Sequence, residues 1–280
     1  MVKQLARKWF DIAGDAAFKV IPQPITVALG LKWLDRAQYA IFDPLNRGGQ
    51  DCYAQDGLYT IHNDRFRYDP AFRAAYARGV KAGDGVDPRM EWRVHVALWA
   101  ASIALRTPGE FVECGVNAGF IGSAIMHRLN WQTVNRNYYC IDTFNGPVLA
   151  QYCPEEADRG RLKAAEDALR NESYWTGLER VRANYSEWPN AIVVQGVVPD
   201  VLPALDIDHV AFLHLDMNCA YPERAALEFF WDRLSPGAVV LLDDYCYRDC
   251  DYQTRSIDEA ARRMGAEVLS MPTGQGIIVK

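Results

Sequence analysis

The sequence predicts an α/β fold built around a mostly parallel β-sheet, and three observations lead to this prediction. Short apolar runs alternate with helical patterns from about residue 90 to the end of the chain. The runs are almost continuously apolar, which indicates strands that are covered on both faces. Four of the runs end in carboxylates, and the carboxyl ends of parallel strands lie at one edge of a sheet, where ligands bind.

The predicted elements follow one another in a regular order. A helix is expected at 90–107, because its apolar residues recur at helical spacing and a Pro-Gly pair ends the pattern. The next elements are strand 111–115, helix 119–129, strand 137–144, helix 155–170, strands 191–196 and 210–217, helix 222–234, strand 237–245 and helix 251–264. Two short strands around a Pro-Thr-Gly turn close the chain and add an antiparallel strand.

The N-terminal part has a different texture. Residues 1–85 are broken repeatedly by Pro, Gly and Asn, and the first twenty residues suggest a short amphipathic helix. We therefore expect a helical and irregular extension at 1–85, acting as a lid or as an oligomer contact, followed by one α/β domain at 86–280. No run is long and apolar enough to span a membrane.

Composition and charge narrow the classes of function. The formal net charge is −6, which argues against nucleic-acid binding, because that requires concentrated Lys and Arg. The seven cysteines form no Cys-x-x-Cys pair, and Cys246 and Cys250 have no second pair with which to complete a zinc site. A reduced, cytoplasmic compartment fits this pattern best.

The first predicted strand ends in an unusual way, with Glu113 followed by Gly115 and Gly119. The glycines allow a tight turn and close approach of a ligand, and the next helix begins there. The spacing is not Gly-x-Gly-x-x-Gly, so binding of a diphosphate is disfavoured. A glutamate beside the turn suits an ammonium or sulfonium group, although a glycine turn with a charge at its edge remains an alternative.

The second predicted strand ends in Asp142, at about the position where an acidic side chain binds ribose hydroxyls in nucleoside sites. A polar residue that merely ends a strand is the simpler alternative. The two sites together describe a ligand with a cationic centre and a ribose but no diphosphate. S-adenosylmethionine is such a ligand.

Three aspartates form the third predicted site. Asp216 ends one strand and Asp243 and Asp244 end the next, so their carboxylates would repel one another unless a cation lay among them. Oxygen ligands favour Mg²⁺, with Mn²⁺ or Ca²⁺ as alternatives. The competing interpretation is that Asp244 caps the following segment and Asp216 pairs with an arginine.

The segments FVECGVNAGF, YCIDTFNG, FLHLDMN and LSPGAVVLLDDY resemble the macrocin O-methyltransferase family, over about residues 110–280. The resemblance implies a Rossmann-like class I methyltransferase fold with a seven-stranded sheet, S-adenosylmethionine, Mg²⁺, a hydroxylated small-molecule acceptor such as a sugar in natural product biosynthesis, and a homo-oligomer. The implied cofactor residues are Glu113, Gly115, Asn117, Gly119, Asp142, Thr143 and Phe144, and the implied metal ligands are Asp216, Asp243 and Asp244.

One motif departs from the family pattern. The family has Asp-x-Asp-Leu-Tyr where this chain has Asp216 and then Asn218, which keeps an oxygen ligand but loses a charge. Asp216 is the first candidate for the group that removes the acceptor proton, and His214 on the same strand is the second. The alternatives to O-methylation are an N- or catechol-type methyltransferase and a binding protein without catalysis.

Overall fold

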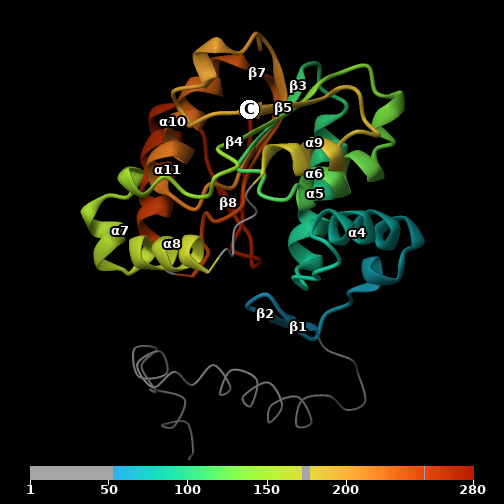
Figure 1. Cartoon of the computed structure of the whole chain (residues 1–280), viewed down its shortest axis with the longest axis horizontal. Helices are drawn as coiled ribbons and strands as arrows, with labels where there is room; N and C mark the ends of the chain where they lie inside the picture. The colour runs from blue at the N-terminus through green and yellow to red at the C-terminus, as the bar shows by residue number, and fades with distance from the viewer. Residues whose placement is uncertain (1–52, 172–176, 249) are drawn as a thin grey trace, which may run out of the picture. The chain divides into compact units, whose positions relative to one another are not determined.

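A computed structural model of the chain describes residues 53–171, 177–248 and 250–280 (Figure 1). The helix expected in the first twenty residues and most of the predicted extension lie outside these residues. The larger of two compact units comprises Gln55–Leu58 and Asn63–Lys280, and it contains the sheet and the candidate site. Short strands β1 (Tyr53–Gln55) and β2 (Leu58–Thr60) pair with each other.

Seven of the described strands form one sheet, in the order β5-β4-β3-β6-β7-β9-β8. β3 pairs in parallel with both β4 and β6, so the strand order reverses between β3 and β6. β9 runs antiparallel to both of its neighbours, β7 and β8. The predicted sheet is confirmed. Its strands are β3 (Glu110–Cys114), β4 (Tyr138–Asp142), β5 (Ala191–Gln195), β6 (Val210–Leu215), β7 (Leu234–Leu242), β8 (Leu269–Ser270) and β9 (Gly276–Val279).

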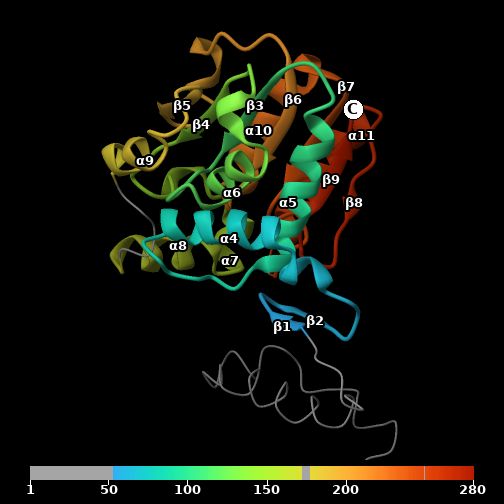
Figure 2. The ribbon, with the colours of Figure 1, turned by 90° about the vertical axis from the view of Figure 1, so that its right-hand side faces the viewer.

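Helices cover both faces of the sheet (Figure 2). On one face lie α4 (Pro70–Ala82), α5 (Glu91–Ala104), α6 (Phe120–Arg128) and α9 (Leu178–Asn184), and on the other lie α10 (Ala220–Phe230) and α11 (Asp251–Arg263). Successive strand residues alternate between the two cores: Phe111 belongs to the first and Val112 to the second. This two-sided burial explains why the strands have no polar face.

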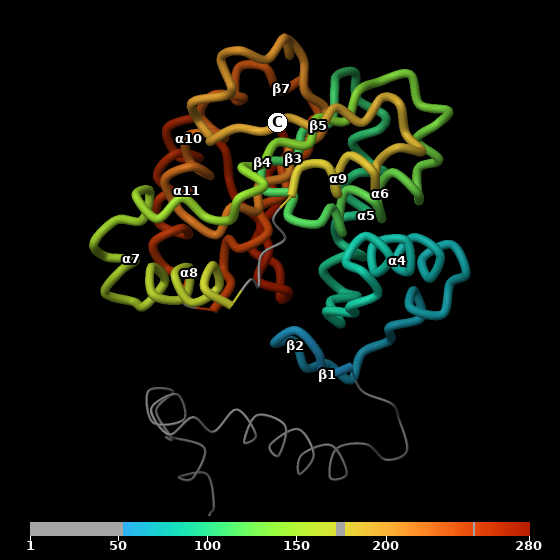
Figure 3. The backbone as a smooth tube through the Cα atoms, viewed as in Figure 1, coloured from blue at the N-terminus to red at the C-terminus, as the bar shows by residue number. Residues whose placement is uncertain are grey.

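The segment between β4 and β5 carries α7 (Pro154–Asp158) and α8 (Arg161–Arg170), as the trace in Figure 3 shows. The sequence predicted one helix at 155–170, which is wrong in this respect. Gly160 adopts a φ of +79° and separates the two helices. The left-handed conformation is not helical, so the chain changes direction there.

Helix α4 lies in the region that the sequence predicted to be largely irregular. Asp69 caps its N-terminus by accepting hydrogen bonds from the backbone N–H groups of Ala71 and Phe72, and Pro70 occupies the first turn. Phe72 and Tyr76 enter the same apolar core as α5 and α6. The Pro and Gly residues around this segment predicted irregular structure, whereas the structure has a capped amphipathic helix there.

Short 3₁₀ helices complete the described chain, at Arg65–Tyr68, Trp131–Thr133, Leu149–Gln151, Leu202–Ala204 and Trp231–Arg233. Among the described helices, none combines the length and apolar character needed to cross a lipid bilayer. The roles of residues 1–85 as lid or oligomer contact stay predictions.

Candidate active site

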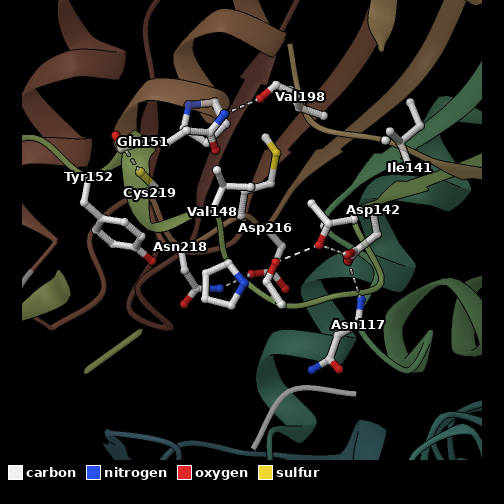
Figure 4. Close-up of a pocket in the computed structure, with 17 residues that line it drawn as sticks. Asn117, Ile141, Asp142, Val148, Gln151, Tyr152, Val198, Asp216, Asn218 and Cys219 are labelled. Carbon is white, nitrogen blue, oxygen red and sulfur yellow. Dashed lines mark hydrogen bonds between the residues drawn. The ribbon is translucent and has the colours of Figure 1, made fainter. Parts of the chain in front are cut away.

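A cavity lies at the carboxyl ends of β3, β4 and β6, beside the reversal of strand order (Figure 4). Five of the predicted site residues line it: Gly115, Asn117, Asp142, Thr143 and Asp216. The segment after β4 and the loop after β6 supply further walls, with Gly146, Pro147, Val148, Gln151, Tyr152, Met217, Asn218 and Cys219. The cavity is therefore both polar and apolar, as a site for an adenosine derivative requires.

Asp142 organises the floor of this cavity. Its Oδ2 accepts hydrogen bonds from the backbone N–H groups of Val116 (2.7 Å) and Asn117 (2.9 Å). Its Oδ1 accepts from the backbone N–H of Phe144, at 2.8 Å. One carboxylate thus fixes the glycine turn after β3 and the turn after β4 in a single arrangement.

Gly115 allows the ends of β3 and β6 to approach each other. It has a φ of +91°, and a Cβ atom on it would lie 1.9 Å from the backbone oxygen of Asp216. The backbone N–H of Asp216 donates to the Cys114 carbonyl at 2.9 Å, which closes the same contact. Only glycine fits this position.

Three of the predicted cofactor residues do not line the cavity: Glu113, Gly119 and Phe144. Glu113 is buried on the α6 face, where its Oε1 lies 3.1 Å from Nδ1 of His214. Gly119 begins α6 beside the Tyr185 hydroxyl, and Phe144 belongs to the apolar core. Direct contact of these three residues with a cofactor stays a prediction.

Two of the three aspartates predicted to hold a metal lie together with His214 in an acidic cluster, and Asp244 is not part of that group. Single ligand atoms of His214, Asp216 and Asp243 lie within 4.8 Å of one another. Asp243 is 2% exposed and Asp244 4% exposed. Oδ2 of Asp244 is buried and makes no hydrogen bond within the described residues. A buried carboxylate oxygen of this kind needs a partner, and a bound cation or a proton would provide one.

The sequence missed a cation that the chain itself brings to this cluster. Arg93 of α5 donates from Nη1 to Oδ2 of Asp243 at 2.7 Å. Its Nε and Nη2 each lie 3.1 Å from an oxygen of Asp56. Gln275 donates to the other oxygen of Asp243 at 2.7 Å. The available signal for Arg93 was a positively charged residue early in a mostly apolar helix.

These neighbours divide the aspartates electrostatically. Burial opposes ionisation of Asp243, but Arg93 and His214 outweigh it and hold the pKa of Asp243 well below its usual range. Burial and then the charge of Asp243 raise the pKa of Asp244 to about 6. Burial together with Asp243 and Asp244 raises the pKa of Asp216 well above its ordinary value. Asp243 therefore carries the settled negative charge, while Asp216 and Asp244 hold their protons to higher pH than ordinary aspartates do.

The neighbouring carboxylates favour the protonated form of His214. Burial lowers its pKa, but the carboxylates of Asp243 and Glu113 prevail and raise the pKa to about 10. Its Nε2 lies 3.8 Å from Asp243, an ion-pair distance rather than a hydrogen bond. A protonated imidazole has no free lone pair for a second proton. The geometry favours His214 as a charge partner, and its role as general base stays an untested prediction.

The donor set fits a hard divalent cation. Carboxylate oxygens are the ligands that Mg²⁺ prefers, and a cation bound here would take the place of the protons that the raised pKa values favour on Asp216 and Asp244. Asp243 has both oxygens in hydrogen bonds with protein side chains, so Arg93 and Gln275 would share it with a metal.

Glu223, at the start of α10, yields a test of this buried electrostatics. It is 1% exposed, and its Oε1 accepts hydrogen bonds from the Met217 N–H and from Gln253. Burial and then Asp244 raise its pKa from 4.5 to about 8. The folded state therefore holds a proton that the unfolded state releases between these two pH values, and stability should fall as pH rises through that window.

Glu223→Gln keeps an acceptor oxygen but does not titrate. We therefore expect this variant not to lose stability through the titration of residue 223 as the pH rises. Between pH 4.5 and 8, the free energy of unfolding of the wild type should fall by on the order of 4 kcal/mol relative to that of the variant. Urea denaturation at several pH values measures the difference. Parallel stability curves for the two proteins would contradict the expected titration.

The sheet order, the helices on both faces and the cavity at the strand reversal define the fold of a class I methyltransferase. The chain belongs to the macrocin-O-methyltransferase (TylF) family, whose model matches residues 93–267. The resemblance found in the sequence is thus confirmed, and the family is one of S-adenosylmethionine-dependent methyltransferases.

Known proteins similar to this chain agree with that assignment. A Streptomyces olivaceus protein, 8-demethyl-8-(2,3-dimethoxy-alpha-L-rhamnosyl)-tetracenomycin-C 4'-O-methyltransferase, is 30% identical over 161 residues, which are 53% of this chain and 59% of the relative. The match thus spans less than two thirds of that relative. The O-methyltransferase NovP has a TM-score of 0.57 at 20% identity, over 67% of this chain and 79% of its own.

A second solved structure shows the same fold. CalS11, a calicheamicin methyltransferase, has a TM-score of 0.51 at 14% identity, and the match covers 78% of this chain and 94% of that chain.

Proposed function

We propose that this protein transfers a methyl group from S-adenosylmethionine to a hydroxyl group of a small molecule, and that the acceptor is a sugar hydroxyl of a natural product. The observation that carries the proposal is the cavity at the strand reversal, with Asp142 and Asp216 both in its lining, in a chain of this family. The name of the Streptomyces olivaceus relative describes O-methylation of a rhamnosyl-bearing compound, which supports a sugar acceptor.

The chain's own residues would hold the cofactor in that cavity. Asp142 offers a carboxylate to the two ribose hydroxyls, and the backbone at Gly115 and Asn117 lies beside it for the amino-acid portion. Ile141, Val148 and Val198 give apolar walls for the adenine ring. When bound, S-adenosylmethionine supplies a methyl group already activated by its sulfonium.

Asp216 is the group that we propose to accept the hydroxyl proton. A sugar hydroxyl is a weak nucleophile at neutral pH, so transfer needs a base within hydrogen-bonding reach. The pKa of Asp216 is raised by burial and by its acidic neighbours, which makes its carboxylate a stronger base than an ordinary aspartate. Its half-buried position at the cavity wall leaves it open to an acceptor.

We also propose that Asp216, Asp243 and Asp244 hold Mg²⁺, or Mn²⁺ or Ca²⁺ in its place. Such an ion would lower the pKa of a bound acceptor hydroxyl. We propose a homo-oligomer on the resemblance to the family, and a cytoplasmic location on the cysteine pattern. Light scattering of the purified protein tests the oligomer.

Two measurements test the proposal. The first is calorimetric titration with S-adenosylhomocysteine. The second is transfer of labelled methyl groups to a panel of glycosylated natural products, with and without EDTA. Binding of the cofactor with transfer to a sugar hydroxyl is the expected result. Transfer only to amines or catechols would replace the acceptor class. Binding with no transfer to any acceptor would favour a binding protein without catalysis, and no binding would refute the proposal.

We expect Asp142→Asn to weaken binding of S-adenosylhomocysteine by about 10- to 100-fold, the equivalent of one charge-assisted hydrogen bond at about 1.5–3 kcal/mol. The backbone N–H groups of Val116 and Asn117 need an acceptor, and the NH₂ group of an asparagine in this position would face them as a second donor. Calorimetry measures the change. Asp206→Asn, at an exposed residue before β6, is the matched control and should bind as the wild type does.

A further inference from the structure

Arg93 connects the acidic cluster to a distant part of the chain. Its guanidinium forms a two-pronged ion pair with Asp56, which lies in the turn between β1 and β2, and a single strong hydrogen bond to Asp243 at the end of β7. The guanidinium also lies over the ring of Tyr247, at 4.7 Å from its centroid. The Tyr247 hydroxyl lies 3.4 Å from Asp56, which closes the arrangement.

The arrangement is largely buried, so its charges interact strongly. The side chains of Arg93, Asp56 and Asp243 are 11%, 16% and 2% exposed. A carboxylate as buried as Asp243 is strongly destabilising unless charges and hydrogen bonds compensate it. The planar fork of arginine can serve two carboxylates at once, which a lysine ammonium cannot do with the same geometry.

The contacts of Asp243 leave it little freedom to rotate. Arg93 holds one carboxylate oxygen, while Gln275 donates to the other and His214 lies 3.8 Å from it. Within the described residues, by contrast, the Asp216 carboxylate accepts only a long 3.3 Å hydrogen bond, from the Asn218 side chain. The orientation of Asp243 is thus set by the protein.

We infer that Arg93 is a positioning residue for methyl transfer: it fixes the Asp243 carboxylate beside Asp216 and is itself fixed by Asp56. The inference rests on the proposed function, because Asp243 is placed in the proposed acidic site. It goes beyond that function by assigning a role to α5 and to the turn at Gln55–Leu58, neither of which lines the cavity.

Arg78 provides a matched control within the same protein. It is also a buried arginine in a helix, it pairs with Glu187 at 2.8 Å, and it lies over the Trp188 ring at 4.7 Å from the centroid. Arg78 is not among the residues of the cavity or the acidic cluster. Arg93→Met and Arg78→Met therefore remove similar interactions, one at the proposed site and one elsewhere.

We expect Arg93→Met to lower kcat by about 10- to 100-fold, as the loss of an outer partner of a metal or catalytic ligand typically does. Its affinity for S-adenosylhomocysteine should stay within about threefold of the wild type, because the cavity is unchanged. Arg78→Met should lose a comparable amount of thermal stability but keep kcat within about threefold. Arg93→Lys keeps the charge without the fork and should recover only part of the loss.

Asp56→Asn tests the second half of the inference, with an expected loss in kcat of about 3- to 10-fold, smaller than that of Arg93→Met. An equal effect of Arg93→Met and Arg78→Met on kcat would overturn the positioning role. A kcat for Asp56→Asn equal to that of the wild type would overturn the link to Asp56.

The inference can fail separately from the proposed function. If the wild type transfers no methyl group, the proposed function fails, and a crystal structure of Arg93→Met then decides whether Arg93 fixes the Asp243 carboxylate. A rotated Asp243 side chain in that variant supports the role, and an unchanged Asp243 overturns it.

Discussion

Asp216→Asn should nearly abolish methyl transfer. The substitution keeps the shape of the side chain but removes the carboxylate oxygen that would accept the proton at the cavity wall. Loss of a positioned general base costs about 10²- to 10⁴-fold in rate, so we expect kcat to fall by that amount. Single-turnover transfer of a labelled methyl group, at saturating cofactor and acceptor, measures the chemical step directly.

The cofactor and the fold should survive this substitution. Asp216 donates its backbone N–H to Cys114, and that contact does not depend on the side chain. Affinity for S-adenosylhomocysteine should therefore change little, and any activation by Mg²⁺ should weaken, since one proposed ligand is lost. Asp206→Asn serves as the control for removal of a surface carboxylate. Wild-type turnover in Asp216→Asn would remove this residue from the mechanism.

The sequence was sufficient for the sheet because burial on both faces leaves a direct mark on the residues. Strands such as Val210–Leu215 are almost wholly apolar, and their alternation with helices determines a parallel arrangement. The carboxyl ends of those strands then predicted which side chains meet. Asp142 and Asp216 line one cavity although 74 positions separate them in the numbering, because β3 lies between their strands.

The counterion of the acidic cluster was beyond prediction for a physical reason. Three converging aspartates do require positive charge, but the sequence does not tell whether a metal or a side chain supplies it. Arg93 lies 150 residues from Asp243 and on a helix, so no strand-end rule places it there. Glu113 shows the same limit: the strand pattern located it, but only packing shows that its carboxylate meets His214 under α6.

The packing at Gly115 leads to the prediction with the largest effect on stability. Gly115→Ala places a methyl group 1.9 Å from the Asp216 carbonyl oxygen, so the ends of β3 and β6 must separate. The residue also needs a φ of +91°, which alanine adopts only with strain. We expect the free energy of unfolding to fall by about 3–5 kcal/mol, the range of severe backbone and packing defects.

Gly85→Ala separates the two causes. Gly85 has a φ of +82°, but a Cβ there meets nothing within 4 Å, so only the strain of about 1–2 kcal/mol applies. Urea denaturation followed by tryptophan fluorescence gives both values, and their difference reports the steric contact alone. Equal losses in the two variants would mean that the strand ends can separate at no cost. In that case the close approach of β3 and β6 would not be what holds Asp216 at the cavity wall.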